Sequence, residues 1–163
     1  MFDRKIEGRF FWSSALICLL CGCSTARPPL GPEFLLAPSL KIEESQAFQK
    51  AASLEPGSRE AEQARIEYLL ERVADSPYNF IRNGSRYNGK RAEVHLRWKY
   101  LRNQQKVATG EEFIKRIATR SKISGEQYLV VLPDKRRLPL RDFLLYELRS
   151  FDQALETKHS PHS

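Results

Sequence analysis

The strongest hydrophobic pattern in the chain lies between residues 109 and 121. Thr109 and Glu112 form a capping box, in which the hydroxyl can accept a hydrogen bond from the third helical amide while the carboxylate reaches back. The apolar or small residues that follow recur at helical spacing and would line one face: Phe113, Ile114, Ile117, Ala118 and Ser121. This segment is therefore predicted to be a helix.

Two further segments show helical spacing of different strength. A helix is predicted from Arg59, with Ser58 as its N-cap and Asp75-Ser76-Pro77 at its end. Its apolar face comprises Ile66, Leu69, Leu70 and Val73. A weaker helix is predicted over residues 39–53 with Ser39 as N-cap, because its apolar face is thin and consists of Leu40, Ala47, Phe48 and Ala51.

Residues 92–100 give two conflicting signals. Apolar and polar residues alternate from Ala92 to Tyr100, which is typical of a strand. The residue types, rich in Ala, Glu, Leu, Arg and Lys, instead favour a helix. We predict a helix, which aligns Ala92, Leu96 and Tyr100 and places His95 and Lys99 beside them.

The remaining patterns predict extended segments and a last helix. Residues 78–82 are short and extended before the turn dipeptide Asn83-Gly84, and residues 128–132 form a hairpin with residues 136–138. Pro139 fits the first turn of a final helix, whose core positions are Phe143, Leu144, Leu148 and Phe151. The predicted fold is mainly α (α+β), a small single domain of about four helices with one short β-hairpin near the C-terminus.

The first 27 residues resemble an export signal. A leader with three basic residues precedes 17 residues without charge, from Phe10 to Ala26. This stretch falls short of the roughly 20 residues of a spanning helix, so a permanent transmembrane anchor is the second choice. All three cysteines (Cys18, Cys21, Cys23) lie here, and a metal site would need about four ligands.

The segment Leu20-Cys21-Gly22-Cys23 resembles a bacterial lipobox, in which small residues precede the lipid-modified cysteine. We predict acylation of Cys23 after removal of residues 1–22; an ordinary cleaved signal with release is the alternative. Ser24 favours the outer membrane over the inner. The resulting organisation is a signal peptide (1–22), a proline-rich tether with a short helix (23–57), a globular domain (58–152) and a disordered tail (153–163).

Six fragments of the globular part resemble a known family in their order and spacing: FIRNG (80–84), Tyr87, HLRWKY (95–100), EEFIKRIATRS (111–121), SGEQY (124–128) and FLLYEL (143–148). Together they resemble the YfeK-like family of small exported bacterial proteins over roughly residues 66–151. Pro77-Tyr78 departs from the expected pattern. The resemblance implies a fold and export, and it implies no particular reaction.

Few residues in the sequence suggest catalysis. His95 is the single histidine of the globular part. Ser121 or Ser124 could form a catalytic triad with His95 and Asp142, but neither serine is surrounded by a nucleophile elbow. The acidic pairs of the chain belong to helix starts, and His95 lacks metal-ligating partners. We therefore predict no enzyme activity, no metal and no cofactor.

One group of polar residues could form a ligand site: Arg82, Asn83, His95, Lys99, Arg120 and Tyr128. Arg82 could bind a carboxylate or phosphate bidentately in such a cationic pocket. A structural interpretation is preferred, in which Asn83 shapes a turn, His95 bonds to backbone and Arg82 pairs with an internal carboxylate. Replacement of Arg82 would then be strongly destabilising.

The formal net charge of +7 suggests either an anionic partner or simply a well-solvated surface. Nucleic acid is disfavoured because no recognised binding motif is present. The leading hypothesis is a lipid-anchored envelope protein, facing the periplasm, that binds a partner protein or an anionic envelope component without catalysis. The alternative is an envelope enzyme with His95 as general base and Arg82 or Lys99 as anion stabiliser.

Overall fold

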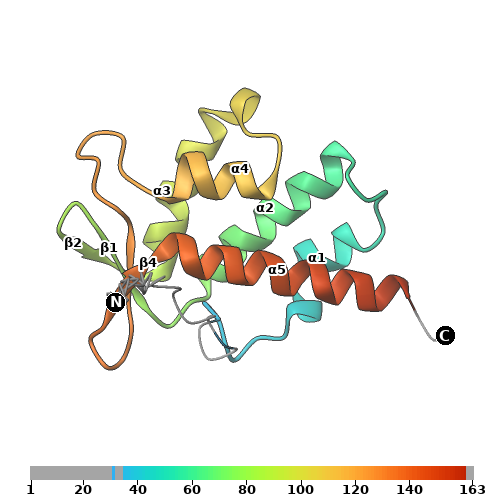
Figure 1. Ribbon diagram of the computed structural model, residues 1–163, viewed down its shortest axis with the longest axis horizontal. Coiled ribbons are helices and arrows are strands. Elements are labelled where there is room, and N and C mark those ends of the chain that lie inside the picture. The colour runs from blue at the N-terminus through green and yellow to red at the C-terminus, as the bar shows by residue number, and fades with distance from the viewer. Residues whose placement is uncertain (1–30, 32–34, 161–163) are drawn as a thin grey trace, which may run out of the picture.

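The computed structural model describes residue 31 and residues 35–160. The predicted signal peptide, with Cys18, Cys21 and Cys23, lies outside the described residues. In Figure 1 the strands lie at one end of the molecule, and the long C-terminal helix α5 extends from there to the other end. The elements in chain order are η2 (Ile42–Glu44), α1 (Gln46–Ala51), α2 (Arg59–Ala74), β1 (Asn79–Arg82), β2 (Ser85–Tyr87), α3 (Gly89–Leu101), η3 (Gln104–Lys106), α4 (Gly110–Phe113), η4 (Ile114–Ala118), β3 (Leu129–Val131), β4 (Arg137–Pro139) and α5 (Leu140–His159).

The predicted helix starts at Ser58 and Thr109 are confirmed by their caps. The Ser58 hydroxyl accepts a hydrogen bond from the Ala61 amide at 3.1 Å, and the Thr109 hydroxyl accepts from the Glu112 amide at 3.2 Å. The Glu112 carboxylate reaches back to the Ala108 amide. The helix after Thr109 is less regular than predicted, because α4 continues as the π-helical segment η4.

The choice of a helix for residues 92–100 is also confirmed. Leu96 and Tyr100 of α3 are buried, whereas Val94 and Trp98 are 64% and 54% exposed. A strand would have placed all four on one face. At the start of α3, Gly89 lies so close to the end of α2 that an added Cβ would be 2.3 Å from the Val73 carbonyl oxygen.

The sheet is larger than the predicted single hairpin. Its four strands are antiparallel in the order β2-β1-β3-β4, so the predicted C-terminal hairpin pairs with a second hairpin, β1-β2. Asn83 and Gly84 both have positive φ (49° and 72°) at the predicted turn. The partner strand β2 was not predicted because its three side chains are exposed or only partly buried and show no apolar alternation.

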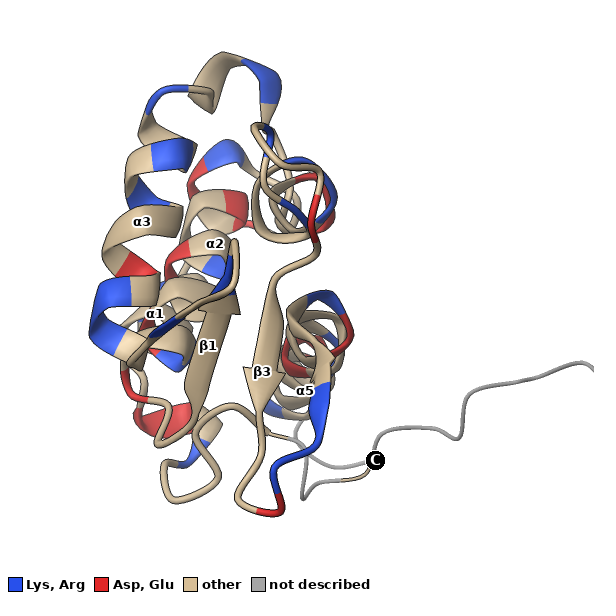
Figure 2. Cartoon of the chain, turned by 90° about the vertical axis from the view of Figure 1, so that its left-hand side faces the viewer, with Lys and Arg blue, Asp and Glu red and all other residues tan. Residues whose placement is uncertain are grey.

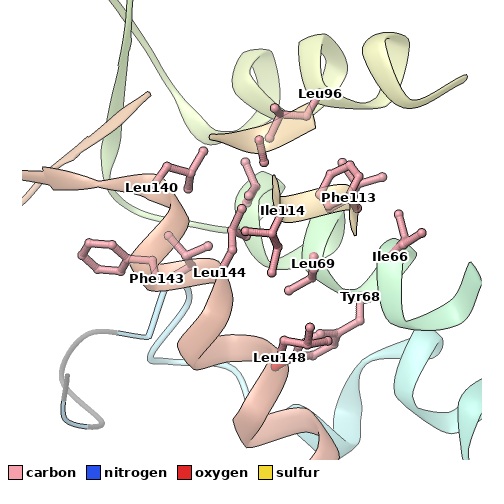
Figure 3. Packing of buried hydrophobic residues seen from close by; sticks show 14 of the residues in the cluster. Ile66, Tyr68, Leu69, Leu96, Phe113, Ile114, Leu140, Phe143, Leu144 and Leu148 are labelled. Carbon is pink, nitrogen blue, oxygen red and sulfur yellow. The ribbon is translucent and has the colours of Figure 1, made fainter. Parts of the chain in front are cut away.

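The core lies between α2, α5 and the α4–η4 segment, as Figure 3 shows for part of the cluster. All predicted core positions of the last helix are buried: Phe143, Leu144, Leu148 and Phe151. They pack with the predicted apolar faces of α2 and of α4–η4. The mainly α fold with a small sheet is therefore confirmed, although α5 begins at Leu140 and not at Pro139.

Both ends of the folded part extend further than predicted. Residues 39–53 form no single helix: α1 is short, and its N-cap is Ser45 and not Ser39. Ala47, Phe48 and Ala51 are buried as predicted, but Leu40 is 41% exposed. At the other end, α5 continues to His159, so most of the predicted disordered tail is helical. Phe48 is fully buried against the core and contacts Phe151.

A buried carboxylate fastens the segment before α1 to the core. Glu147 of α5 is completely buried, and one of its oxygens accepts a hydrogen bond from the Leu36 amide at 2.6 Å. The other oxygen accepts from the Tyr68 hydroxyl at 2.8 Å and from Arg72 Nε at 3.1 Å. Burial raises the pKa of the Tyr68 hydroxyl, and the adjacent carboxylate raises it further.

Arg72 completes this connection with its two remaining nitrogens. They donate to the Ala37 and Leu40 carbonyl oxygens at 2.7 and 3.0 Å. The side chain of Arg72 is 3% exposed, and its charge is balanced by Glu147. The two charged groups are thus paired and hydrogen-bonded, which is the condition under which buried charges are tolerated.

Candidate functional site

A groove of about 380 Å³ lies between α3, the segment after η4 and the end of β1. Four cationic residues line it: Arg82, Lys99, Arg102 and Lys122. None of its lining residues is acidic. His95 and the buried Tyr128 lie where the groove meets the sheet. The electrostatic character of the groove is therefore positive.

Lys99 is fixed in place by the end of the η4 segment. Its ammonium group donates to the Ile117 carbonyl, to the Arg120 carbonyl at 3.2 Å and to the Tyr128 hydroxyl at 3.2 Å. Burial lowers the pKa of Lys99 to about 8, with Lys122 and Arg82 adding to the effect. Lys99 therefore remains charged at neutral pH, but its three protons already have acceptors.

His95 contacts Tyr128 and not the backbone acceptor that the sequence suggested. Its Nε2 lies 3.4 Å from the Tyr128 hydroxyl. Burial lowers the pKa of His95 to about 4, and the positive charges of Arg82 and Lys99 lower it in the same direction. The imidazole is therefore neutral at neutral pH.

Arg82 has an unused donor. Its Nε is buried and has no hydrogen-bond partner within the described part of the chain. The internal carboxylate predicted for Arg82 is absent: over residues 35–160 no acidic side chain forms an ion pair with it. The guanidinium instead lies beside Tyr128, where it opposes the rise that burial causes in the pKa of that hydroxyl. A buried donor without an acceptor is uncommon in folded proteins.

A second, smaller pocket of about 40 Å³ shares Arg82, His95 and Tyr128 with the groove. Its other polar lining comes from Tyr87 and Arg91, and the rest of its wall is mainly apolar. The volume suffices for a few water molecules and not for a larger ligand. The groove is therefore the side from which a ligand would reach Arg82.

The structure brings together four of the six predicted site residues: Arg82, His95, Lys99 and Tyr128. Asn83 shapes the turn as predicted, and its side-chain oxygen accepts a hydrogen bond from Ser124 at 2.7 Å. Asn83 does not line the groove. Arg120 does not line it either; its carbonyl oxygen accepts a hydrogen bond from Lys99.

Sequence reasoning missed five residues that line the groove: Trp98, Arg102, Asn103, Lys122 and Ile123. Trp98 and Arg102 are four residues apart, a spacing that places them on one helical face and could have linked them. The Arg102 guanidinium lies 4.9 Å from the centre of the Trp98 ring. Lys122 gave no local signal, because its place beside α3 depends on the tertiary fold.

The serines considered for a triad serve the turn after η4. The Ser121 hydroxyl accepts hydrogen bonds from the Ile123 and Ser124 amides at 3.3 and 3.4 Å. Ser121 is almost completely buried. In the part of the chain that the structure covers, no three His, Cys, Asp or Glu residues are placed to hold a metal ion.

The titration of His95 provides a test of this geometry. We expect a midpoint near pH 4 in place of the ordinary 6.5. Between these values the unfolded chain binds a proton that the folded chain excludes. The stability that His95 contributes is therefore fully present above pH 6.5 and is lost as the pH falls toward 4. Ring NMR signals against pH measure the midpoint, and Arg82→Gln should raise it by removing a nearby charge. A midpoint at 6.5 would contradict the placement of His95.

Comparison with known proteins places the chain in a family. Residues 60–152 match the model described as a family of unknown function, DUF5329. The chain belongs to this family. It is also similar to the "Uncharacterized protein YfeK" of Salmonella typhimurium strain LT2, with 37% identity over 68 residues. That alignment covers 41% of this chain and 57% of the relative's length. The predicted YfeK-like assignment is confirmed, and neither description assigns a reaction. No solved structure matches the chain.

Proposed function

We propose that this DUF5329 protein is a lipid-anchored bacterial envelope protein that binds an anionic envelope component without catalysis. The groove beside α3 is the binding site. Cys23 carries the lipid anchor, and the folded part faces the periplasm, with the outer membrane favoured over the inner.

The buried, unpartnered Nε of Arg82 carries this proposal. An oxyanion in the groove would supply the missing acceptor, and a guanidinium binds carboxylate and phosphate groups with two parallel hydrogen bonds. Arg102 and Lys122 are exposed on the same groove, where no acidic side chain competes for them. Lys99 adds positive potential, although its own donors are occupied.

The enzyme alternative receives less support from the same geometry. A general base works best with a pKa near the operating pH, whereas the pKa of His95 is lowered to about 4. Its hydrogen-bond partner among the described residues is Tyr128, and no carboxylate there orients the ring as in a triad. Lys99 is also occupied by its three acceptors and is not free to bind an anion directly.

The replacement Arg82→Gln tests the proposed site. We expect it to weaken binding of inorganic pyrophosphate, the probe anion, at least about tenfold, because a charge-assisted bidentate contact is removed. The His95 ring signals should move on addition of pyrophosphate in the unchanged chain, and titration calorimetry measures the affinity. Arg86→Gln is the matched control, because Arg86 is exposed on the same hairpin and does not line the groove.

Thermal unfolding of the same variant tests whether the fold stays intact. No carboxylate loses a partner, so we expect the midpoint to fall by less than about 3 °C, where 1 kcal/mol corresponds to about 4–8 °C. This result differs from the strong destabilisation inferred from the sequence. Equal pyrophosphate affinity for Arg82→Gln and Arg86→Gln would refute the site.

The lipid anchor has a direct test of its own. We expect mass spectrometry of the mature chain to find Cys23 as an acylated first residue, and Cys23→Ser to release the protein from membranes. The motive is the lipobox-like Leu20-Cys21-Gly22-Cys23 after an apolar, uncharged stretch. An unmodified peptide that runs through Gly22-Cys23 would contradict the anchor. No helix of residues 35–160 is long and apolar enough to span a membrane.

A further inference from the structure

The outer face of α3 exposes an unusual set of apolar side chains. Val94, Trp98 and Leu101 are 64%, 54% and 57% exposed. Their spacing of four and three residues places them on one side of the helix. Ile123, which is 89% exposed, lies on the loop that faces Trp98 across the groove. Contiguous exposed apolar side chains of this kind mark interaction surfaces. We call these four residues the α3 face.

Positive charge surrounds the α3 face. Arg102 lies over the Trp98 ring, and Lys122 precedes Ile123 in the loop. Figure 2 shows Lys and Arg at several positions along α3. The single acidic residue of α3, Glu93, is paired with Arg97, which also binds Glu67. No acidic side chain lines the groove next to the face.

We propose that the α3 face docks onto an anionic phospholipid bilayer, with the groove cations on lipid phosphates and the apolar side chains in the interfacial layer. The inference rests on the proposed function, because it identifies the anion of the groove as a lipid phosphate. Tryptophan concentrates at membrane interfaces, and basic residues near an anionic surface add attraction.

A protein partner fits this surface less well. Lysine is depleted in protein interfaces, whereas here Lys122 lies directly beside the exposed apolar side chains. A bilayer offers phosphate and hydrocarbon within a few ångströms of each other. It therefore complements both kinds of side chain at once.

Trp98 allows docking to be measured directly in the full chain. The chain has two tryptophans, so Trp12→Phe leaves Trp98 as the single emitter. Vesicles carry brominated lipid as quencher and contain either phosphatidylglycerol with phosphatidylcholine or phosphatidylcholine alone. The measured quantity is the Trp98 emission lost to quenching divided by the emission that remains, at saturating lipid, so that docking raises this ratio. This ratio reports whether the α3 face is docked, even if the N-terminal segment holds the chain to the vesicle in both cases.

We expect strong quenching and a blue shift with phosphatidylglycerol, and little of either with phosphatidylcholine alone. Arg102→Gln with Lys122→Gln should lower the ratio at least about tenfold, because each basic residue near an anionic surface contributes roughly fivefold. Val94→Ser with Ile123→Ser should also lower it. Leu40→Ser, at an exposed leucine away from α3, is the matched control and should leave the ratio unchanged.

Two results would overturn the docking proposal: absence of quenching with phosphatidylglycerol, or equal quenching with both vesicle types. The pyrophosphate titration distinguishes failure of the docking proposal from failure of the proposed anion site. If pyrophosphate still binds in an Arg82-dependent way but Trp98 is not quenched, the anion site stands and the bilayer is eliminated as its ligand. Loss of both would eliminate the site itself.

Discussion

Replacing Glu147 with alanine should destabilise the folded state by about 3–5 kcal/mol, because it leaves the buried charge of Arg72 without its partner. The Leu36 amide and the Tyr68 hydroxyl would lose their acceptor as well. This loss is a large part of the 5–15 kcal/mol that typically stabilises a domain. Denaturant unfolding measures the change.

A double-mutant cycle separates the ion pair from general disruption. Glu147→Gln and Arg72→Met are each expected to be costly, and the double variant should cost less than the sum of the two. The expected coupling is about 0.5–3 kcal/mol, the range for residues in one buried network. Strictly additive costs would show that the two side chains do not act as a pair.

The substitution Ile117→Asp should unfold the domain. Ile117 is 1% exposed in the η4 segment, and its carbonyl oxygen accepts a hydrogen bond from Lys99. Burial of an unpaired carboxylate costs several kcal/mol, comparable with the whole stability of a small domain. Far-UV circular dichroism and thermal unfolding measure the effect.

Lys115→Asp is the matched control for this substitution. It introduces the same side chain two residues away in the same segment, at an exposed position. We expect a change within about 0.5 kcal/mol, as for most surface substitutions. An unchanged melting midpoint for Ile117→Asp would mean that the apolar face of η4 does not pack in the core.

Helices α2 and α5 and the α4–η4 segment were predictable because each buries a face whose spacing is visible in the sequence, whereas α3 was predicted from its residue types. The same argument could have found Glu147, which lies among the core positions of α5 between Leu144 and Leu148. A charged residue at a core position calls for a buried partner. Its identity, Arg72, depends on how α2 and α5 pack, which no local pattern contains.

The candidate site was predictable to a smaller extent. Polar residues on α3 and at the β1–β2 turn indicated where Arg82, His95 and Lys99 gather, and the structure brings them together with Tyr128. The assignment of an internal carboxylate to Arg82 was wrong, because the fully buried carboxylate of Glu147 pairs with Arg72. A positive charge alone does not identify which of the 27 Lys and Arg residues pairs with a buried carboxylate.

The hydrogen bond between the Leu36 amide and Glu147 also sets a length. If Cys23 carries the lipid, 13 peptide steps join the anchor to Leu36. A chain of that length spans at most about 45 Å, at about 3.3–3.6 Å per residue. The folded part would then stay close to the membrane that carries its lipid anchor, and it could not contact a more distant membrane.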